Sequence, residues 1–282
     1  MIKGPVPDMT KPSRLLIVGL GVALVSTSLV YAQQIWLGGG FSRFSARFGQ
    51  LEDFDGSFLY CRGFYGSGRG GGGWSTDYPG ADHNFSVRLA ELTRVTVKFD
   101  VDRQPYHVVV RLDDPTLFRC PMVFMTNVEN LRFTESEVAG LREYLVKGGF
   151  LWVDDFWGSY AWANWANEIS RVLPPAQFPI FDIPISHQIM HTVYDVTDFL
   201  QVPNINFWYQ TGGAVSERGY DSAQVHYRGI QDAQNRMMVL ATHNTDVSDT
   251  WEREGENADY FNHFSPRGYA IGVNVVVYAL TH

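Results

Sequence analysis

The sequence contains little charge, and most of that charge is negative. Asp, Glu, Lys and Arg make up 18% of the 282 residues, and the formal net charge is −8. The charges before residue 43 sum to +2, so the remainder of the chain carries −10. Because an acidic surface repels the phosphate backbone, we exclude nucleic acid as a partner. The hydrophobic share of 45% also excludes a disordered chain, since disorder requires low hydrophobicity.

Residues 15–42 contain no charged side chain at all. The apolar stretch Leu15–Ala32 would be about 27 Å long as a helix, close to the roughly 30 Å hydrocarbon core of a membrane. Basic residues precede it, which keeps the N-terminus in the cytoplasm. We therefore expect a single-pass inner-membrane protein with most of the chain in the periplasm: cytoplasmic residues 1–14, a transmembrane anchor over 15–37 with Trp36 at the far interface, a tether over 38–57 and an exported domain over 58–282.

A cleaved signal peptide is the alternative interpretation of the same stretch. Val30-Tyr31-Ala32 would be an acceptable cleavage site because it ends in a small residue. The apolar core of a signal peptide is usually about 7–15 residues long, which is shorter than Leu15–Ala32 and favours the retained anchor. Both interpretations export the domain.

The chain has only two cysteines, Cys61 and Cys120. Cys61 falls late in an expected strand over 58–62, whereas Cys120 comes just before an expected strand over 121–126. If these strands are parallel neighbours, the two sulfur atoms lie at opposite ends of the sheet, about 16 Å apart, which is beyond disulfide reach. We therefore expect two free, buried thiols.

Short β-rich runs alternate with amphipathic helices along the exported part. One helix is marked by the capping box Thr134-Glu-Ser-Glu137 and stops at Gly148-Gly149. This alternation predicts a single α/β domain with a mostly parallel sheet covered on both faces. The other expected elements are strands over 58–62, 108–112, 122–126, 150–153 and 237–242, helices over 82–94, 157–173 and 269–280, and a hairpin around 225–236.

The sequence lacks the usual motifs for a catalytic nucleophile or a bound cofactor. It has no Gly-x-Ser-x-Gly elbow, and neither cysteine sits on a glycine-flanked turn between strand and helix. The glycine run Gly66–Gly73 is not followed by the Lys-Ser/Thr pair of a phosphate-binding loop, so we interpret it as a flexible loop. We expect no cofactor.

Acidic residues follow several expected strands. Asp154 and Asp155 end a buried strand at the carboxyl edge of the sheet, which is where open α/β sheets bind ligands. Such carboxylates could hold a metal or raise one another's pKa for acid–base chemistry. The catalytic candidates are Asp77, Asp154, Asp155 and His187, and the expected ligand pocket is formed by Arg62, Trp74, Asp77, Asn244, Asp246 and Asp249.

Structural roles are the alternative for these side chains. Asp82 is placed to cap the helix over 82–94, and Arg62 is the only basic residue at a strand end. We expect Arg62 to form a salt bridge with Asp77, Asp154 or Asp155, which would leave too few carboxylates for a tight metal site. His187 and His191 have a spacing that could bind zinc on a helix, but the segment is interrupted by prolines. We assign no metal ligand.

Several of these motifs, in this order, resemble one uncharacterised bacterial family, catalogued as domain of unknown function 4159. The resemblance rests on Trp74–Pro79, Leu141–Leu145, Gly148–Leu151, Asp154-Asp155, Asn244-x-Asp246 and Gly272–His282. It implies a flavodoxin-like α/β sandwich similar to the class I glutamine-amidotransferase fold. Asp154-Asp155 stands where amidotransferases carry their nucleophilic cysteine, so that activity is not implied. A membrane-anchored member also resembles the accessory subunit of a phototroph's reaction-centre–light-harvesting complex.

Two functions of different classes follow from the sequence. The first is a non-catalytic, membrane-anchored periplasmic subunit that stabilises a larger complex of integral membrane proteins. Because aromatic residues are enriched at protein interfaces, we expect the interface to contain Trp36, Trp157, Tyr160, Trp162 and Trp165. The second is an exported metal-dependent hydrolase or ligand-binding enzyme that uses the acidic residues. For the aromatic segment, an amphipathic core helix is the plainer interpretation.

Overall fold

The computed structural model describes residues 46–66 and 73–282, which belong to one compact unit. The expected anchor, including Trp36, and most of the glycine run lie outside the described residues. No helix of the described part is both long and apolar enough to cross a membrane. Residues 46–54, part of the expected tether, lie against the sheet, because the backbone of Phe48 bridges that of Val109.

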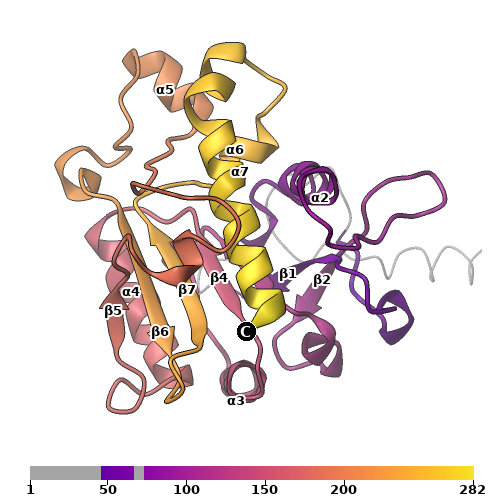
Figure 1. The fold of residues 1–282 in the computed structure, drawn as a ribbon. Coiled ribbons are helices and arrows are strands. Elements are labelled where there is room, and N and C mark those ends of the chain that lie inside the picture. Colours follow the sequence, from indigo (N-terminus) through magenta and orange to yellow (C-terminus); the bar gives the residue numbers. More distant parts are fainter. Residues whose placement is uncertain (1–45, 67–72) are drawn as a thin grey trace, which may run out of the picture. The chain divides into compact units, whose positions relative to one another are not determined.

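The described chain folds into an α/β structure around a seven-stranded mixed sheet (Figure 1). The strand order is β2-β1-β3-β4-β7-β6-β5. The first five strands in this order pair in parallel, whereas β6 and β5 extend the sheet as antiparallel neighbours. The strands are β1 (Tyr60–Phe64), β2 (His107–Arg111), β3 (Val123–Thr126), β4 (Leu151–Asp154), β5 (Ile180–Asp182), β6 (His226–Gln231) and β7 (Met237–His243).

Helices cover both faces of the sheet, as the alternation of strands and helices predicts. Figure 1 shows α7 crossing one face, with α4 on the other. The capping box at Thr134 and Glu137 is confirmed at the start of α3. The helices are α2 (Gly80–Leu92), α3 (Glu135–Val146), α4 (Gly158–Val172), α5 (Ile205–Thr211), α6 (Asp249–Glu252) and α7 (Ala258–Thr281).

Side chains alternate between the two faces of the sheet along each strand, and this divides the hydrophobic core into two layers. Val123 and Met125 of β3 pack in one hydrophobic cluster with residues of α3 and α4, such as Leu141. Phe124, between them, points to the other face and packs with residues of α2 and α7. Successive side chains of a strand point to opposite faces, so one buried strand serves both layers.

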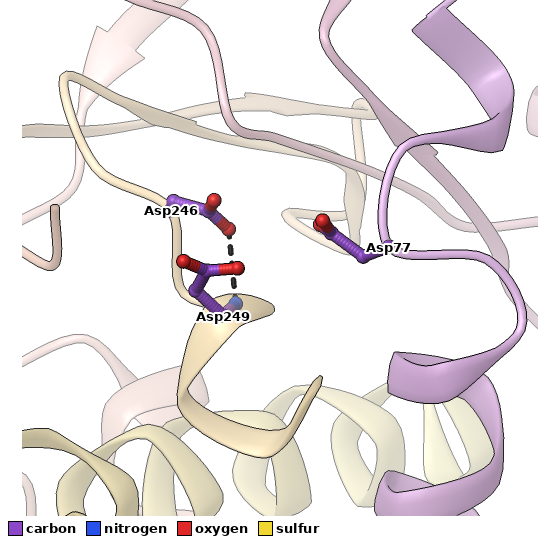
Figure 2. Close-up of side chains that lie close together, drawn as sticks. All are labelled: Asp77, Asp246 and Asp249. Carbon is purple, nitrogen blue, oxygen red and sulfur yellow. Dashed lines mark hydrogen bonds between the residues drawn. The ribbon is translucent and has the colours of Figure 1, made fainter. Parts of the chain in front are cut away.

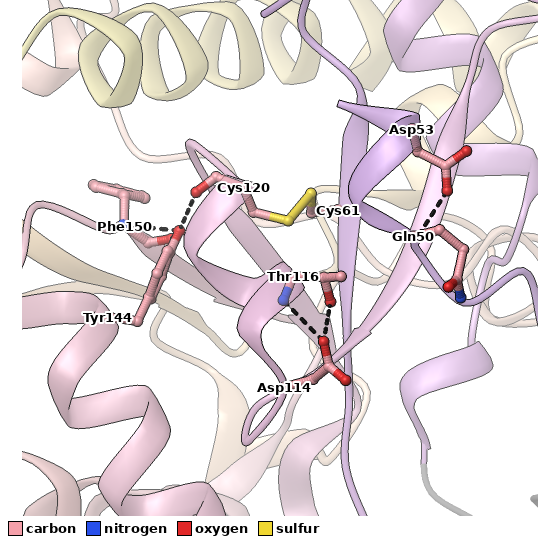
Figure 3. The surroundings of a disulfide bond; sticks show 8 residues. All are labelled: Gln50, Asp53, Cys61, Asp114, Thr116, Cys120, Tyr144 and Phe150. Carbon is pink, nitrogen blue, oxygen red and sulfur yellow. Dashed lines mark hydrogen bonds between the residues drawn. A yellow bond between two sulfur atoms is a disulfide. The ribbon is translucent and has the colours of Figure 1, made fainter. Parts of the chain in front are cut away.

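The prediction of two free thiols is wrong, because Cys61 and Cys120 form a disulfide (Figure 3). The error lies in the strand boundary: β1 begins at Tyr60, two residues later than expected, so Cys61 is near its start. Arg62 aligns with Phe124 of β3, which puts Cys61 at the same sheet edge as Cys120. The hydroxyl of Tyr144 donates a hydrogen bond to the carbonyl oxygen of Cys120 at 3.0 Å and so ties α3 to this corner.

Candidate functional site

Three neighbouring parallel strands each end in a residue with left-handed backbone geometry. Asn127 follows β3, Asp155 follows β4 and Asn244 follows β7, with φ angles of 52°, 50° and 62°. Asp77, in the loop before α2, has a φ of 63°. Asn and Asp tolerate this conformation better than other L-residues, yet it remains uncommon and tends to gather at functional sites. The carboxyl edge of the sheet is therefore built from sharp, polar turns.

Asp77, Asp246 and Asp249 converge at this edge (Figure 2). Each offers a carboxylate oxygen, and these oxygens all lie within 4.8 Å of one another. The Ser248 hydroxyl lies 3.0 Å from Asp77 Oδ2 and 2.9 Å from Asp246 Oδ1. A hydroxyl carries a single hydrogen, so it can donate to only one of these two carboxylates at a time. Asp246 Oδ1 also accepts from the backbone N–H of Asp249 at 3.0 Å, but the cluster as a whole is short of hydrogen-bond donors.

Asp249 shows this shortage most clearly. Its side chain is buried, and Oδ2 accepts a hydrogen bond of 3.3 Å from the backbone N–H of Ile205. Oδ1 is also buried and has no hydrogen-bond partner; the closest cationic atom is Arg253 Nε at 3.6 Å. A buried polar oxygen without a donor is destabilising, so it calls for a proton or a cation.

Burial controls the protonation of the whole group. Removal from water raises the pKa of Asp77, Asp155, Asp246 and Asp249, and the neighbouring carboxylates add to the rise for the last three. The pKa of Asp154 rises to about 7 for the same reason, although hydrogen bonds from Thr242 and Ser248 oppose the rise. Strongly raised carboxylate pKa values in one place are typical of sites that bind or transfer charge.

Asp154 has a different role from its neighbours. Its side chain is buried, Oδ1 accepts from the Thr242 hydroxyl at 2.6 Å, and Oδ2 accepts from the backbone N–H of Ser248 at 2.9 Å. Oδ1 thus ties Asp154 to β7, whereas Oδ2 holds the turn that carries Ser248 between Asp77 and Asp246. Asp154 therefore helps to position the cluster and is not one of its members.

A polar cavity of about 250 Å³ lies beside the cluster. Asp77, Asp155 and Asp246 reach it, and the indole N–H of Trp157 orients Asp155 by donating to Oδ1 at 3.0 Å. Acidic groups far outnumber basic ones in the lining, where Arg218 is the single cationic side chain. The full lining is Thr76, Asp77, Asn127, Glu129, Asp155, Phe156, Trp157, Asn204, Glu217, Arg218 and Asp246.

Arg62 does not neutralise the cluster, contrary to our expectation. It forms its ion pair with Asp82, and both side chains are buried. Asp82 in turn does not cap α2, because the helix begins at Gly80 and Asp82 already lies within its first turn. Arg62 also donates to the carbonyl oxygens of Trp74 and Thr76, at 3.2 and 2.7 Å, and so supports the loop that presents Asp77. Arg62 thus forms no salt bridge with Asp77, Asp154 or Asp155.

Two other predicted site residues have contacts of their own. Asn244 accepts from the backbone N–H of Gly158 at 2.8 Å and therefore fixes the start of α4. His187 accepts from the N–H of Ile189, while His191 lies 2.7 Å from a carboxylate oxygen of Asp195. The two histidines thus have separate partners, and neither lines the acidic cavity.

The aromatic segment of α4 belongs mostly to the core. Trp157 and Trp165 are buried, and Trp162 is half-buried with the Arg228 guanidinium 3.9 Å from its ring centre. Only Tyr160 is well exposed, at 67%. The sequence did not single out the cavity residues Glu217 and Arg218, because they lie in an irregular segment without periodicity.

Comparison with models of known protein families gives a match over most of the chain. A family model described as "Domain of unknown function (DUF4159)" matches residues 65–280. The matched range contains the acidic cluster and every residue of the cavity lining, whereas Arg62 lies just before it. No curated protein matches the chain.

Proposed function

The chain belongs to this family of domains of unknown function, and from that premise we propose that its acidic cavity binds a divalent cation together with a small polar ligand. The ligand is either retained or hydrolysed there. The observation that carries the proposal is the donor-poor cluster of Asp77, Asp246 and Asp249, with one buried oxygen of Asp249 unpartnered.

The chemistry of the cluster favours a hard cation. Carboxylate oxygens are the ligands that Ca²⁺ and Mg²⁺ prefer, and Ca²⁺ accepts them at about 2.3–2.6 Å in flexible geometry. A cation would satisfy Asp249 Oδ1 and would remove the repulsion among the three carboxylates. It would also polarise an oxygen of a ligand in the adjoining cavity, where Asp155 is placed to exchange a proton with that ligand.

The topology supports a ligand site at this edge. The five parallel strands follow the order 2-1-3-4-5 of flavodoxin-like folds when β7 is counted as the fifth strand, and we assign the fold to that class, which the amidotransferase-like proteins share. In such sheets, ligands bind beyond the carboxyl ends of the strands, where the strand order reverses. Here that point lies between β1 and β3, beside Thr76, Asp77 and Asn127.

We further propose that the domain lies outside the cytoplasm. The disulfide between Cys61 and Cys120 supports this location, because disulfides persist in oxidising compartments and are rare in the cytosol. The uncharged stretch of residues 15–42 supports an inner-membrane anchor with the domain in the periplasm.

Calorimetric titration of the full chain in detergent with Ca²⁺ and with Mg²⁺ tests the cation proposal. We expect binding of one ion, weakened at least about tenfold by Asp246→Asn and by Asp249→Asn, because each change removes a charged ligand. Asp195→Asn is the matched control, because this exposed carboxylate lies outside the cluster. Absence of binding, or equal affinity in all four proteins, would refute the proposal.

A second candidate function is the anchored, non-catalytic subunit of a larger membrane complex. The observation that favours it is a pair of exposed tyrosines, Tyr160 at 67% and Tyr220 at 99%. Their neighbours are bonded to each other, since the Ser159 N–H donates to Asp221 Oδ2 at 2.9 Å, so the two tyrosines share one surface. Tyrosine is enriched at protein interfaces. By resemblance, the first candidate partner is a phototroph's reaction-centre–light-harvesting complex.

Gentle detergent solubilisation, followed by identification of proteins that co-purify in stoichiometric amounts, tests this second function. We expect an integral membrane partner that is lost when Tyr160→Ser and Tyr220→Ser are combined. Tyr209→Ser, at another exposed tyrosine, is the control. A chain that purifies alone under these conditions contradicts the subunit function and leaves the cation proposal untouched.

A further inference from the structure

The acidic cavity has one end that solvent reaches and one end that is buried. The side chain of Arg218, a lining residue, is 54% exposed, and Glu129, whose carboxylate lies 3.9 Å from the guanidinium, is 35% exposed. Asp246, another lining residue, is only 3% exposed. A ligand would therefore enter beside Arg218 and place its far end against Asp246 and Asp77.

The buried end of the cavity offers hydrogen-bond acceptors that have no donor. Asp246 Oδ1 accepts from the Ser248 hydroxyl and from the N–H of Asp249, whereas Oδ2 has no hydrogen-bond partner among the residues that the structure describes. Asp155 is similar, because Trp157 donates to Oδ1 and no described residue donates to Oδ2. A ligand that reaches this end has to bring hydrogen-bond donors with it.

Other lining side chains offer donors. Asn204 Oδ1 accepts from the N–H of Asn206 at 3.0 Å and so caps α5, which leaves the Nδ2 group free to donate. The side-chain amide of Asn127 has no partner within the described part of the chain, and the Arg218 guanidinium carries five N–H donors. A ligand that satisfies both sets of groups has to donate and accept hydrogen bonds.

These requirements select hydroxyl groups, which both donate and accept. An ammonium group only donates, so it could not accept from the amides and the guanidinium. A phosphate or carboxylate group would be repelled, because the lining contains five carboxylates and one arginine. The cavity of about 250 Å³ is smaller than the 300–1,000 Å³ typical of sites for drug-sized ligands, which fits a single sugar ring.

We propose that the small polar ligand of the acidic cavity is a neutral sugar, bound with two neighbouring hydroxyl groups toward Asp77 and Asp246. The inference rests on the proposed function for one contact, in which the cation takes the same two hydroxyl oxygens as ligands. Asp77 faces Asp246 and Asp249 from a separate segment (Figure 2), and Ca²⁺ takes six to eight oxygen ligands, so three carboxylates leave positions for hydroxyl groups. The other end of the sugar points toward Arg218, where either a free monosaccharide or the terminal ring of a longer glycan fits.

Saturation-transfer difference NMR of the full chain, in a detergent whose headgroup is not a sugar, tests for this ligand. The probes are glucose, galactose and mannose, each with and without Ca²⁺, and spermidine is the cationic comparison. We expect at least one hexose to bind, Ca²⁺ to strengthen its binding and spermidine not to displace it. Lactose and maltose distinguish the two sources: a disaccharide that binds as tightly as the hexose identifies the terminal ring of a glycan, whereas binding of the hexose alone identifies a free sugar.

Asp155→Asn is the most specific variant. Asparagine keeps the oxygen that accepts from Trp157 and tolerates the φ of 50°, but it replaces the free acceptor by a donor. Sugar binding should weaken about tenfold or more, which corresponds to one lost hydrogen bond to a charged group, and Arg218→Met should weaken it for the same reason. Asp195→Asn and Arg267→Met, which alter exposed ion pairs elsewhere, should bind sugar like the unaltered chain.

Calcium calorimetry on the same proteins separates this inference from the cation proposal. Asp155→Asn should weaken sugar binding more than calcium binding, and Asp249→Asn should do the reverse, because Asp249 belongs to the cluster and does not line the cavity. Calcium binding without binding of any sugar would overturn the sugar inference alone, as would equal sugar affinity in Asp155→Asn and Asp195→Asn or tighter binding of spermidine. Sugar binding by a chain that binds no calcium would support the sugar and refute the cation.

Discussion

Arg62 and Asp82 form a wholly buried ion pair between the inner strand β1 and the first turn of α2. Arg62 Nε lies 3.1 Å from Asp82 Oδ1 and 3.2 Å from Oδ2, and neither side chain is exposed. The same guanidinium holds the carbonyl oxygen of Thr76 at 2.7 Å. One cation thus joins the strand, the helix and the loop that carries Asp77.

Replacing Asp82 by Ala should destabilise the domain by about 3–5 kcal/mol, because Arg62 would remain as a buried, unpaired charge. Urea unfolding measures this change. Glu91→Ala is the control: Glu91 pairs with Arg88 on the surface, and exposed pairs contribute at most about 1 kcal/mol. A loss for Asp82→Ala as small as that for Glu91→Ala would contradict the structural role of the pair.

Breaking the disulfide should also destabilise the domain. Cys61 and Cys120 are 59 residues apart in the sequence, and closing a loop of that length restricts the unfolded chain by about 4 kcal/mol in the chain-entropy estimate. We expect a loss of that size when Cys61→Ser and Cys120→Ser are combined. Urea unfolding with and without reductant measures it, and detection of two free thiols in the purified, denatured chain would show that the bond is absent.

The stability of the cation-free domain should fall as the pH rises from about 4 to 7. Burial raises the pKa of Asp154 to about 7 from its ordinary 3.8, so the folded state binds a proton that the unfolded state has released. The stabilisation from this proton is complete at a pH below the pKa of Asp154 in the unfolded chain. It is lost as the pH rises through the pKa of Asp154 in the folded domain. A pKa shift of this size corresponds to at most about 4 kcal/mol of the free energy of unfolding.

Asp154→Asn provides the comparison for this pH dependence. Asparagine resembles the protonated acid in shape but does not titrate, so the slope of stability against pH should become shallower. Asp195→Asn serves as the surface control and should keep the slope of the unaltered chain. Urea midpoints at pH 5, 6, 7 and 8 give the slopes. A stability that increases over this range in the unaltered chain would refute the assignment.

Replacing Gly140 by Ala should destabilise the domain although alanine favours helices. A Cβ at this position of α3 would lie 2.1 Å from the backbone oxygen of Leu112, which cannot move without shifting its own segment. Overpacking costs about 1–3 kcal/mol, more than the roughly 1 kcal/mol that alanine gains over glycine in a helix. Gly255→Ala, where a Cβ meets nothing within 4 Å, is the control; thermal unfolding compares the two.

The sequence predicted those features that depend on periodicity and local signals. The capping box at Thr134, the strand that ends at Asp154 and the placement of acidic residues at the carboxyl edge all follow from short-range patterns. The predictions for the two cysteines and for the ion-pair partner of Arg62 were wrong for one shared reason. Each depends on strand register, and the expected β1 was displaced by two residues, which moved Cys61 to the wrong end of the strand.

The rest of the site depends on long-range contacts that carry no local pattern. Glu217 and Arg218 reach the cavity from a segment without regular periodicity. The buried state of Asp249 likewise results from the packing of α6 against α2 and α7. Only the assembled fold brings these side chains together, so their partners could not be read from spacing.

The position of β1 has a practical consequence for the boundaries of the domain. The family match begins at residue 65, one residue after β1 ends, yet β1 lies between β2 and β3 in the sheet. A protein trimmed to residues 65–280 would lose the strand that joins two others, half of the disulfide and the partner of Asp82. Such a fragment would expose two strand edges and bury an unpaired carboxylate, so the folding unit of this chain has to start upstream of the matched range.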